Sequence, residues 1–139
     1  MPSRIALMTL LVREYDQAID FYVHAAGFEL VEDTDLGHGK RWVRVRPRHT
    51  PQHGCELLLA RATTDAQRAA IGNQTGGRVM GFLETDDFAR DHAAMTARGV
   101  RFSETPRAEA YGTVAVFEDC YGNRWDLIEY ANDSSTPTS

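Results

Sequence analysis

IALMTLLVREYDQAIDFYVHAAG, residues 5–27, has the same plan as RVMGFLETDDFARDHAAMTARG, residues 78–99. Each stretch begins with an apolar run of strand length, continues with the spacing of an amphipathic helix and ends at Gly27 or Gly99. Glycine accepts the left-handed backbone conformation that ends a helix, so each predicted helix stops there and a new strand begins. This internal repeat predicts two copies of one structural unit.

Three candidate strands follow each predicted helix. The helices span residues 16–26 and 87–98, and the strands after them span 28–34, 40–46 and 55–60 in the first half and 100–104, 113–118 and 124–130 in the second. Each half is therefore a βαβββ module, whose single helix covers only one face of a four-stranded sheet. We predict an α+β fold in which two tandem modules form a curved eight-stranded mixed sheet, with a central cavity inside and the helices outside.

The length of the chain sets its domain organisation, because 139 residues suit one domain with a substantial core. We expect a single domain over residues 1–131, with module one at about 4–62, a linker at 63–77 and module two at 78–131. The last residues, NDSSTPTS at 132–139, contain no side chains for a core, and we predict a disordered tail.

Composition and charge exclude several classes of function. The formal net charge of -5 argues against a generic nucleic-acid-binding surface. No apolar stretch approaches the roughly 20 residues that a membrane span needs, and residues 5–12 lead directly into Arg13 without a signal-peptide cleavage site. We therefore expect a cytoplasmic protein with neither nucleic-acid nor membrane partners. Cys55 and Cys120 are too few for a disulfide framework and are predicted to be free thiols.

Three stretches carry a resemblance to a known family. They are VREYDQAIDFYVHAAGFEL (12–30), GFLETDDFARDHAAMTARGVRF (81–102) and YGTVAVFEDCYGNRWDLIEY (111–130), the last being the most specific. The sequence resembles the vicinal oxygen chelate superfamily, which includes glyoxalase I, extradiol dioxygenases, fosfomycin-resistance enzymes and bleomycin-resistance proteins. The resemblance covers roughly residues 4–131 and implies the fold and a homodimer. It says less about chemistry, because this fold carries many activities.

The resemblance also implies where a metal site would lie. Metal-dependent members hold a divalent ion at four positions, which in this chain are Leu7, Glu56, Met80 and Asp126. Leu7 cannot bind a metal, and the Met80 thioether is a poor ligand for hard ions. Glu56 and Asp126 alone are too few for tight binding of zinc, nickel or iron. We therefore expect no cofactor, and a divalent metal held in an atypical site remains the alternative.

The predicted cavity contains three acidic candidates. Strand alternation places Met80, Phe82 and Glu84 on one face, which by the resemblance faces the cavity. Glu56, Glu84 and Asp126 are then expected to approach one space, lined by Leu7, Thr9, Leu11, Met80 and Phe82. Neighbouring carboxylates raise each other's pKa, so one of them can act as a general acid or base, or the group can hold a cationic ligand. The alternative is that they are solvated carboxylates without a function.

Two further segments contribute candidates for ligand binding. If residues 36–39 form the turn of the hairpin 29–46, Asp35 faces Lys40 and Glu29 faces Arg46, and these charges simply stabilise the hairpin. In the rival interpretation Trp42 and Arg44 reach into the cavity. In the loop 105–112, Arg107 and Tyr111 either clamp a ligand at the cavity mouth or form a rigid connection.

Two classes of function follow from these candidates. The first is a small-molecule-binding protein similar to bleomycin-resistance proteins, with a degenerate metal site and the ligand held in the sheet cavity. The second is an enzyme, either a metal-assisted lyase, isomerase or dioxygenase with an atypical site or a metal-free acid–base catalyst. In both cases the expected partners are a small-molecule ligand and a second copy of the chain.

Overall fold

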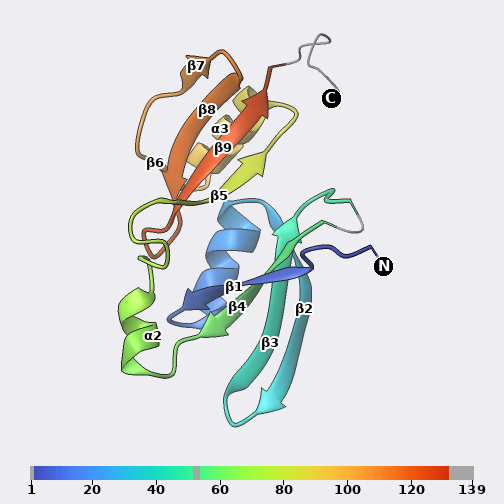
Figure 1. Ribbon diagram of the computed structural model, residues 1–139, viewed down its shortest axis with the longest axis vertical. Coiled ribbons are helices and arrows are strands. Elements are labelled where there is room, and N and C mark those ends of the chain that lie inside the picture. The colour runs from blue at the N-terminus through green and yellow to red at the C-terminus, as the bar shows by residue number, and fades with distance from the viewer. Residues whose placement is uncertain (1, 52–53, 132–139) are drawn as a thin grey trace.

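The computed structural model describes residues 2–51 and 54–131. Its elements follow the predicted repeat, and Figure 1 shows the two modules as the lower and upper halves of the molecule. Module one comprises β1 (Leu7–Val12), α1 (Tyr15–Ile19), η1 (Asp20–Ala25), β2 (Phe28–Gly37), β3 (Lys40–Pro47) and β4 (Glu56–Arg61). Module two comprises β5 (Val79–Glu84), α3 (Phe88–Ala97), β6 (Arg101–Phe102), β7 (Arg107–Glu109), β8 (Gly112–Glu118) and β9 (Arg124–Tyr130). The α+β class and the repeated βαβββ plan are confirmed, and the tail predicted at 132–139 lies outside the described residues.

The strands form two sheets, where the sequence predicted one continuous sheet. The first sheet has the order β1-β4-β3-β2, and the second has the order β5-β9-β8-β6 with β7 also paired to β8. In each sheet the first strand runs parallel to the last, β1 beside β4 and β5 beside β9, and the remaining pairs are antiparallel. The two modules therefore repeat one topology.

The strand predicted at 100–104 is interrupted, and part of the predicted loop 105–112 is a strand. β6 and β7 lie on either side of residues 103–106, and both pair with β8. The Val116 N–H donates to the Glu104 carboxylate at 2.9 Å, so a side chain replaces the backbone acceptor at this point of the ladder. Pro106 has no N–H to continue the ladder.

The first helix ends in a wider turn than the sequence predicted. After α1 the chain continues as a π-helix, η1, in which the Ala26 N–H donates to the Phe21 carbonyl at 2.8 Å. Gly27 follows with φ +86°, which ends the helix and starts β2. Such π turns are rare and often lie at functional sites.

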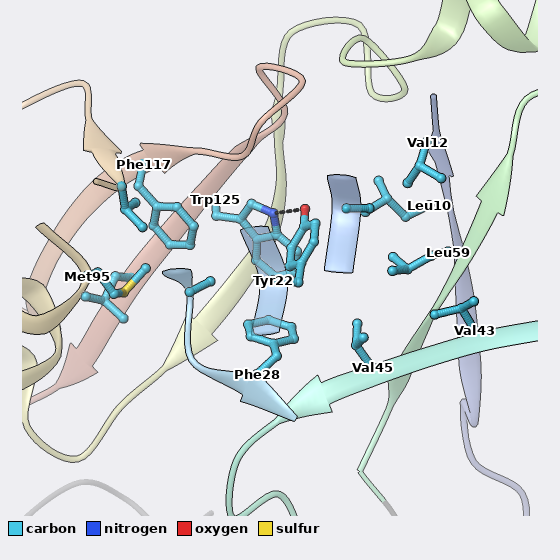
Figure 2. Close-up of a cluster of buried hydrophobic side chains, with 14 of the residues drawn as sticks. Leu10, Val12, Tyr22, Phe28, Val43, Val45, Leu59, Met95, Phe117 and Trp125 are labelled. Atoms are coloured by element: carbon cyan, nitrogen blue, oxygen red, sulfur yellow. Dashed lines mark hydrogen bonds between the residues drawn. The ribbon is translucent and has the colours of Figure 1, made fainter. Parts of the chain in front are cut away.

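The modules share one hydrophobic core between the helix-covered faces of the sheets. Figure 2 shows Tyr22 and Phe28 of module one packed beside Phe117 and Trp125 of module two. The Tyr22 hydroxyl donates to Asp119 Oδ2 at 2.5 Å and accepts from Trp125 Nε1 at 3.1 Å. This polar joint is buried and links η1 directly to the turn before β9.

The face of each sheet that points away from this shared core is called its open face. On the first sheet, Leu10, Val43, Val45 and Leu59 belong to the core, so their alternating neighbours Thr9, Trp42, Arg44, Arg46, Glu56 and Leu58 lie on the open face. On the second sheet, the same alternation places Phe82, Asp126 and Ile128 opposite Leu83, Trp125 and Leu127. Each sheet therefore has one face toward the shared core and one face away from it.

The linker closes one strand edge. The Gln74 side-chain amide donates to the Thr9 carbonyl at 2.7 Å and accepts from the Leu11 N–H at 2.9 Å, so it bonds the outer edge of β1 as a neighbouring strand would. Within the linker, α2 (Asp65–Ala70) begins at Thr64, whose hydroxyl accepts from the Gln67 N–H at 3.1 Å. Among the residues that the structure describes, no helix is long and apolar enough to cross a membrane.

Candidate functional site

Asp126 is the residue that stands out on the open face of the second sheet. It lies in the middle of β9, opposite Phe82 on β5 and Val116 on β8. Its Oδ1 atom is buried and has no hydrogen-bond partner among the described residues. Burial raises the pKa of Asp126, and Glu104 adds to the rise, while the positive charges of Arg107 and Arg124 oppose it. Asp126 therefore keeps an unused hydrogen-bond acceptor on this face, within the described part of the chain.

The surroundings of this carboxyl are apolar. Val114, Val116 and Ile128 are buried, yet they are not part of the shared core, because they lie on the open side of β8 and β9. Phe82, beside Asp126, is 65% exposed. We call the group Phe82, Val114, Val116, Asp126 and Ile128 the Asp126 face. It combines an apolar floor, an exposed aromatic ring and one unsatisfied acceptor.

Arg107 and Tyr111, the two candidates from the loop 105–112, differ in their contacts and exposure. The Arg107 guanidinium is held by Glu104 at 2.9 Å and Glu109 at 2.5 Å, and its charge acts on Asp126 without a hydrogen bond to it. Tyr111 is exposed in the turn between β7 and β8. Glu104 therefore anchors this segment from both sides, through Arg107 and through the backbone of Val116.

Glu56 is fully engaged on the open face of the first sheet. It contacts the Arg44 guanidinium and lies 3.6 Å from Arg46 Nη1. Arg44 also binds Glu32 at 3.0 Å, and Arg46 binds Glu29 at 2.8 Å. We call these five residues the arginine ladder. The two interpretations of Arg44 are compatible, because it lies on the open face and pairs with hairpin carboxylates at the same time.

One predicted hairpin pair is wrong and the other is confirmed. Glu29 pairs with Arg46 in the strand register, as predicted. Asp35 pairs with Arg41 because the register shifts between Leu30 and Glu32, and Lys40 pairs with Gly37 after a second shift between Asp35 and Gly37. Trp42 lies opposite Thr34 and is half-buried on the open face.

The remaining candidates do not gather around one space. Leu7 pairs with Glu56 in the β1–β4 register, and Thr9 is exposed two residues further along β1. Met80 packs against the shared core, next to a register shift between Val79 and Gly81. Glu84 ends β5 and lines a groove between the modules. The cluster of Glu56, Glu84 and Asp126 that the sequence suggested is therefore divided between two sheets and a groove.

The residues at the family's metal positions do not fit a metal ion. Glu56 already binds two arginines, and Leu7 and Met80 supply no oxygen, nitrogen or thiolate ligand. Across residues 2–51 and 54–131, no three His, Cys, Asp or Glu side chains are grouped so that they could hold a metal. Asp126 is the one position of the four with an unused acceptor.

Two features of the site escape sequence reasoning. The sequence predicts that Val114, Val116 and Ile128 lie on strands. The alternation of residues does not show which face of the sheet they occupy. Glu104 belongs to no sequence motif. Its hydrogen bond to the Val116 N–H forms at the break between β6 and β7, which the sequence did not predict.

Comparison with known proteins identifies relatives along nearly the whole chain. A Shewanella frigidimarina protein, named only as uncharacterized, is 51% identical over 130 residues, covering 93% of this chain and 95% of its own. The crystal structure of UcmS2 aligns with a TM-score of 0.79 at 28% identity, covering 92% of this chain and 98% of that one. TnmS3, an antibiotic binding protein from Streptomyces sp. CB03234, aligns with a TM-score of 0.74 at 29% identity, covering 94% and 98%.

A family model matches both modules of the chain. The match spans residues 4–127, from before β1 to the middle of β9, and so includes both modules and the Asp126 position. The chain belongs to the Glyoxalase/Bleomycin resistance protein/Dioxygenase superfamily.

Proposed function

We propose that this protein binds a small molecule on the Asp126 face and does so without a metal ion. The observation that carries the proposal is the buried, unpartnered Oδ1 of Asp126 beside the exposed ring of Phe82, among the residues that the structure describes. Leaving a buried acceptor unsatisfied costs about 1–3 kcal/mol, so a site that keeps one is better explained by a ligand than by stability. The likeness to the antibiotic binding protein TnmS3 supports this class of function.

The chemistry of the face defines the ligand that we expect. The carboxyl accepts a hydrogen bond from an ammonium or hydroxyl group, and the apolar floor and Phe82 suit a flat, largely apolar body. The arginine ladder supplies no free carboxylate to such a ligand, because Glu56 is bound by two arginines. Recognition through Asp126 therefore governs which molecules bind.

We further propose that two copies of the chain associate through their open faces. In one chain Phe82 is 65% exposed on the second sheet, and Trp42 is half-buried on the first. A homodimer that brings an Asp126 face against the open face of a partner would enclose the ligand and cover these side chains.

The test is a thermal-shift screen of cationic and neutral aromatic compounds, followed by calorimetry on any compound that raises Tm. We expect binding to the wild type, a loss of about tenfold or more in Asp126→Asn, and no change in the control Asp20→Asn, an exposed residue of η1. If the compounds that bind do so equally to Asp126→Asn, the Asp126 face is not the site.

The raised pKa of Asp126 favours a second function, metal-free acid–base catalysis. A carboxyl that has an unused acceptor atom, and whose pKa is raised by burial, can act as a general acid or base toward a bound substrate. Mass spectrometry of each bound compound after prolonged incubation separates the two functions. Unchanged compound supports binding, whereas conversion that is lost in Asp126→Asn supports catalysis.

A further inference from the structure

A groove of about 820 Å³ separates the two modules on the side of the helices. Its floor is formed by apolar core side chains, Phe28, Leu83, Met95 and Leu127. One wall follows the end of η1 and the end of β3, and the other follows the end of β5 and α3. The groove contains none of the residues of the Asp126 face, so it is a separate place on the molecule.

Arg48 of module one and Arg98 of module two both line this groove. A side chain at Gly27 would lie 3.6 Å from Arg98 Nη1, so the guanidinium of α3's C-cap residue lies over the glycine. Arg48 directly follows the end of β3 and also lines the groove. The groove therefore carries one arginine from each module, with that of Arg98 beside Gly27.

Arg48 and Arg98 have no ion-pair partner within residues 2–51 and 54–131, unlike the third arginine of the groove. Arg90 is bound by Asp86 at 2.8 Å and by Asp91 at 2.9 Å. Asp91 also accepts the Thr85 hydroxyl, and these partners lower its pKa despite partial burial. The charge of Arg98 also contributes to the lowered pKa of Asp91, but within the described residues neither Arg48 nor Arg98 forms an ion pair as Arg90 does.

We propose that this groove binds a small organic carboxylate whose charged end is held by Arg48 and Arg98 and whose hydrocarbon end lies on Phe28 and Met95. Guanidinium groups match the two oxygens of a carboxylate. The apolar floor suits a short hydrocarbon or phenyl group. Glu84 and Asp86 on the far wall disfavour a dianionic phosphate, so a single negative charge fits better.

The experiment uses 3-phenylpropanoate as the probe, with its neutral amide and phenyl phosphate for comparison. Binding is followed by calorimetry and by amide NMR shifts of Gly27 and neighbouring residues in the full chain. We expect 3-phenylpropanoate to bind and to shift Gly27, the amide to bind at least about tenfold more weakly, and phenyl phosphate to bind more weakly than the carboxylate.

Matched variants test the two arginines. Arg98→Gln and Arg48→Gln, both at exposed positions, are each expected to weaken 3-phenylpropanoate binding about tenfold, while the exposed β6 residue Arg101→Gln leaves it unchanged. Asp126→Asn is expected to retain binding in the groove, which separates this proposal from the function of the Asp126 face. No binding of the carboxylate, equal binding of the amide, or binding unaffected in the Arg48→Gln, Arg98→Gln double variant would each overturn the proposal.

Discussion

Asp126 has an unpaired Oδ1 atom within the described residues, and its burial disfavours the ionised form of the carboxyl. Because burial raises its folded-state pKa above the ordinary value of 3.8, the ionised carboxylate is less favourable in the folded chain than in the unfolded one. The folded state is therefore penalised at neutral pH. This loss of stability decreases as the pH falls through the folded-state pKa. It is absent below the ordinary pKa of 3.8, where the carboxyl is protonated in both the folded and the unfolded chain.

Replacing Asp126 with Asn is expected to increase the free energy of unfolding at pH 7, because the ionised carboxylate is then absent from the folded chain. The gain should shrink toward zero near pH 3, because the wild-type carboxyl is then protonated in both states. Urea unfolding of both proteins across this pH range measures the difference. A variant that is less stable than the wild type at pH 7 would show that the carboxylate has a stabilising partner.

Tyr22 is the second residue whose ionisation should change the stability of the protein with pH. Burial, the charge of Asp119 and its hydrogen bond to Asp119 raise the pKa of Tyr22 well above its ordinary value of 10.0. An unfolded chain ionises this tyrosine first, so stability is complete below about pH 10 and falls as the pH rises above it. Tyr22→Phe is expected to lose about 1–3 kcal/mol at pH 7, because Asp119 and Trp125 each lose a buried partner.

The measurement for Tyr22 is urea unfolding at pH 7 and at pH 10.5. The stability difference between wild type and Tyr22→Phe should narrow at the higher pH. The control is Tyr130→Phe, because Tyr130 is exposed at the end of β9 and should give no difference at either pH. A constant difference for Tyr22→Phe would contradict the buried pairing.

At the scale of elements, the arginine ladder joins three neighbouring strands, β2, β3 and β4, through ion pairs. Glu56→Gln is expected to lower stability by about 1 kcal/mol at low salt, with a smaller loss at 1 M salt, since both arginines lose a partly buried partner. Addition of Zn²⁺ or Ni²⁺ is expected to leave Tm of the wild type unchanged. Differential scanning calorimetry checks both. A metal-induced rise in Tm that Glu56→Gln abolishes would mean that the ladder opens to form a metal site.

The elements that the sequence predicted well are those whose pattern is local. The helix–glycine–strand order at Gly27 and Gly99, and the pairing of Glu29 with Arg46, depend on neighbouring residues and were correct. The shift that moved Asp35 from Lys40 to Arg41 is a bulge, which alternation alone does not reveal. The break between β6 and β7 depends on Glu104 reaching Val116, a contact between residues far apart in the chain.

The candidate site was less predictable than the fold for a related reason. The family resemblance placed Glu56 and Asp126 at two of the four metal positions, but the two residues have opposite environments. Arg44 and Arg46 on β3 pair with Glu56, whereas valine and isoleucine surround Asp126. Such differences arise from tertiary neighbours, which one sequence does not display.

At the scale of the whole molecule, the two modules are joined through their helix-covered faces, and the open faces point away from that joint. This arrangement leads to the expectation of a homodimer. Light scattering at micromolar concentration should give twice the mass of one chain, and Phe82→Asp should shift the protein toward the monomer. Leu36→Asp, at the exposed end of β2, is the control and should leave the mass unchanged. A wild-type monomer at that concentration would exclude association through the open faces.

The Gln74 amide gives the edge of β1 an unusual property. A neighbouring strand would cover this edge with a row of backbone bonds, but here one side chain supplies a donor and an acceptor to Thr9 and Leu11. Rotation of the Gln74 side chain would remove both hydrogen bonds from β1 without unfolding any part of the sheet. The Gln74 side chain thus prevents strands of other molecules from pairing with the edge of β1. Breaking its two hydrogen bonds would leave this edge able to pair with another strand.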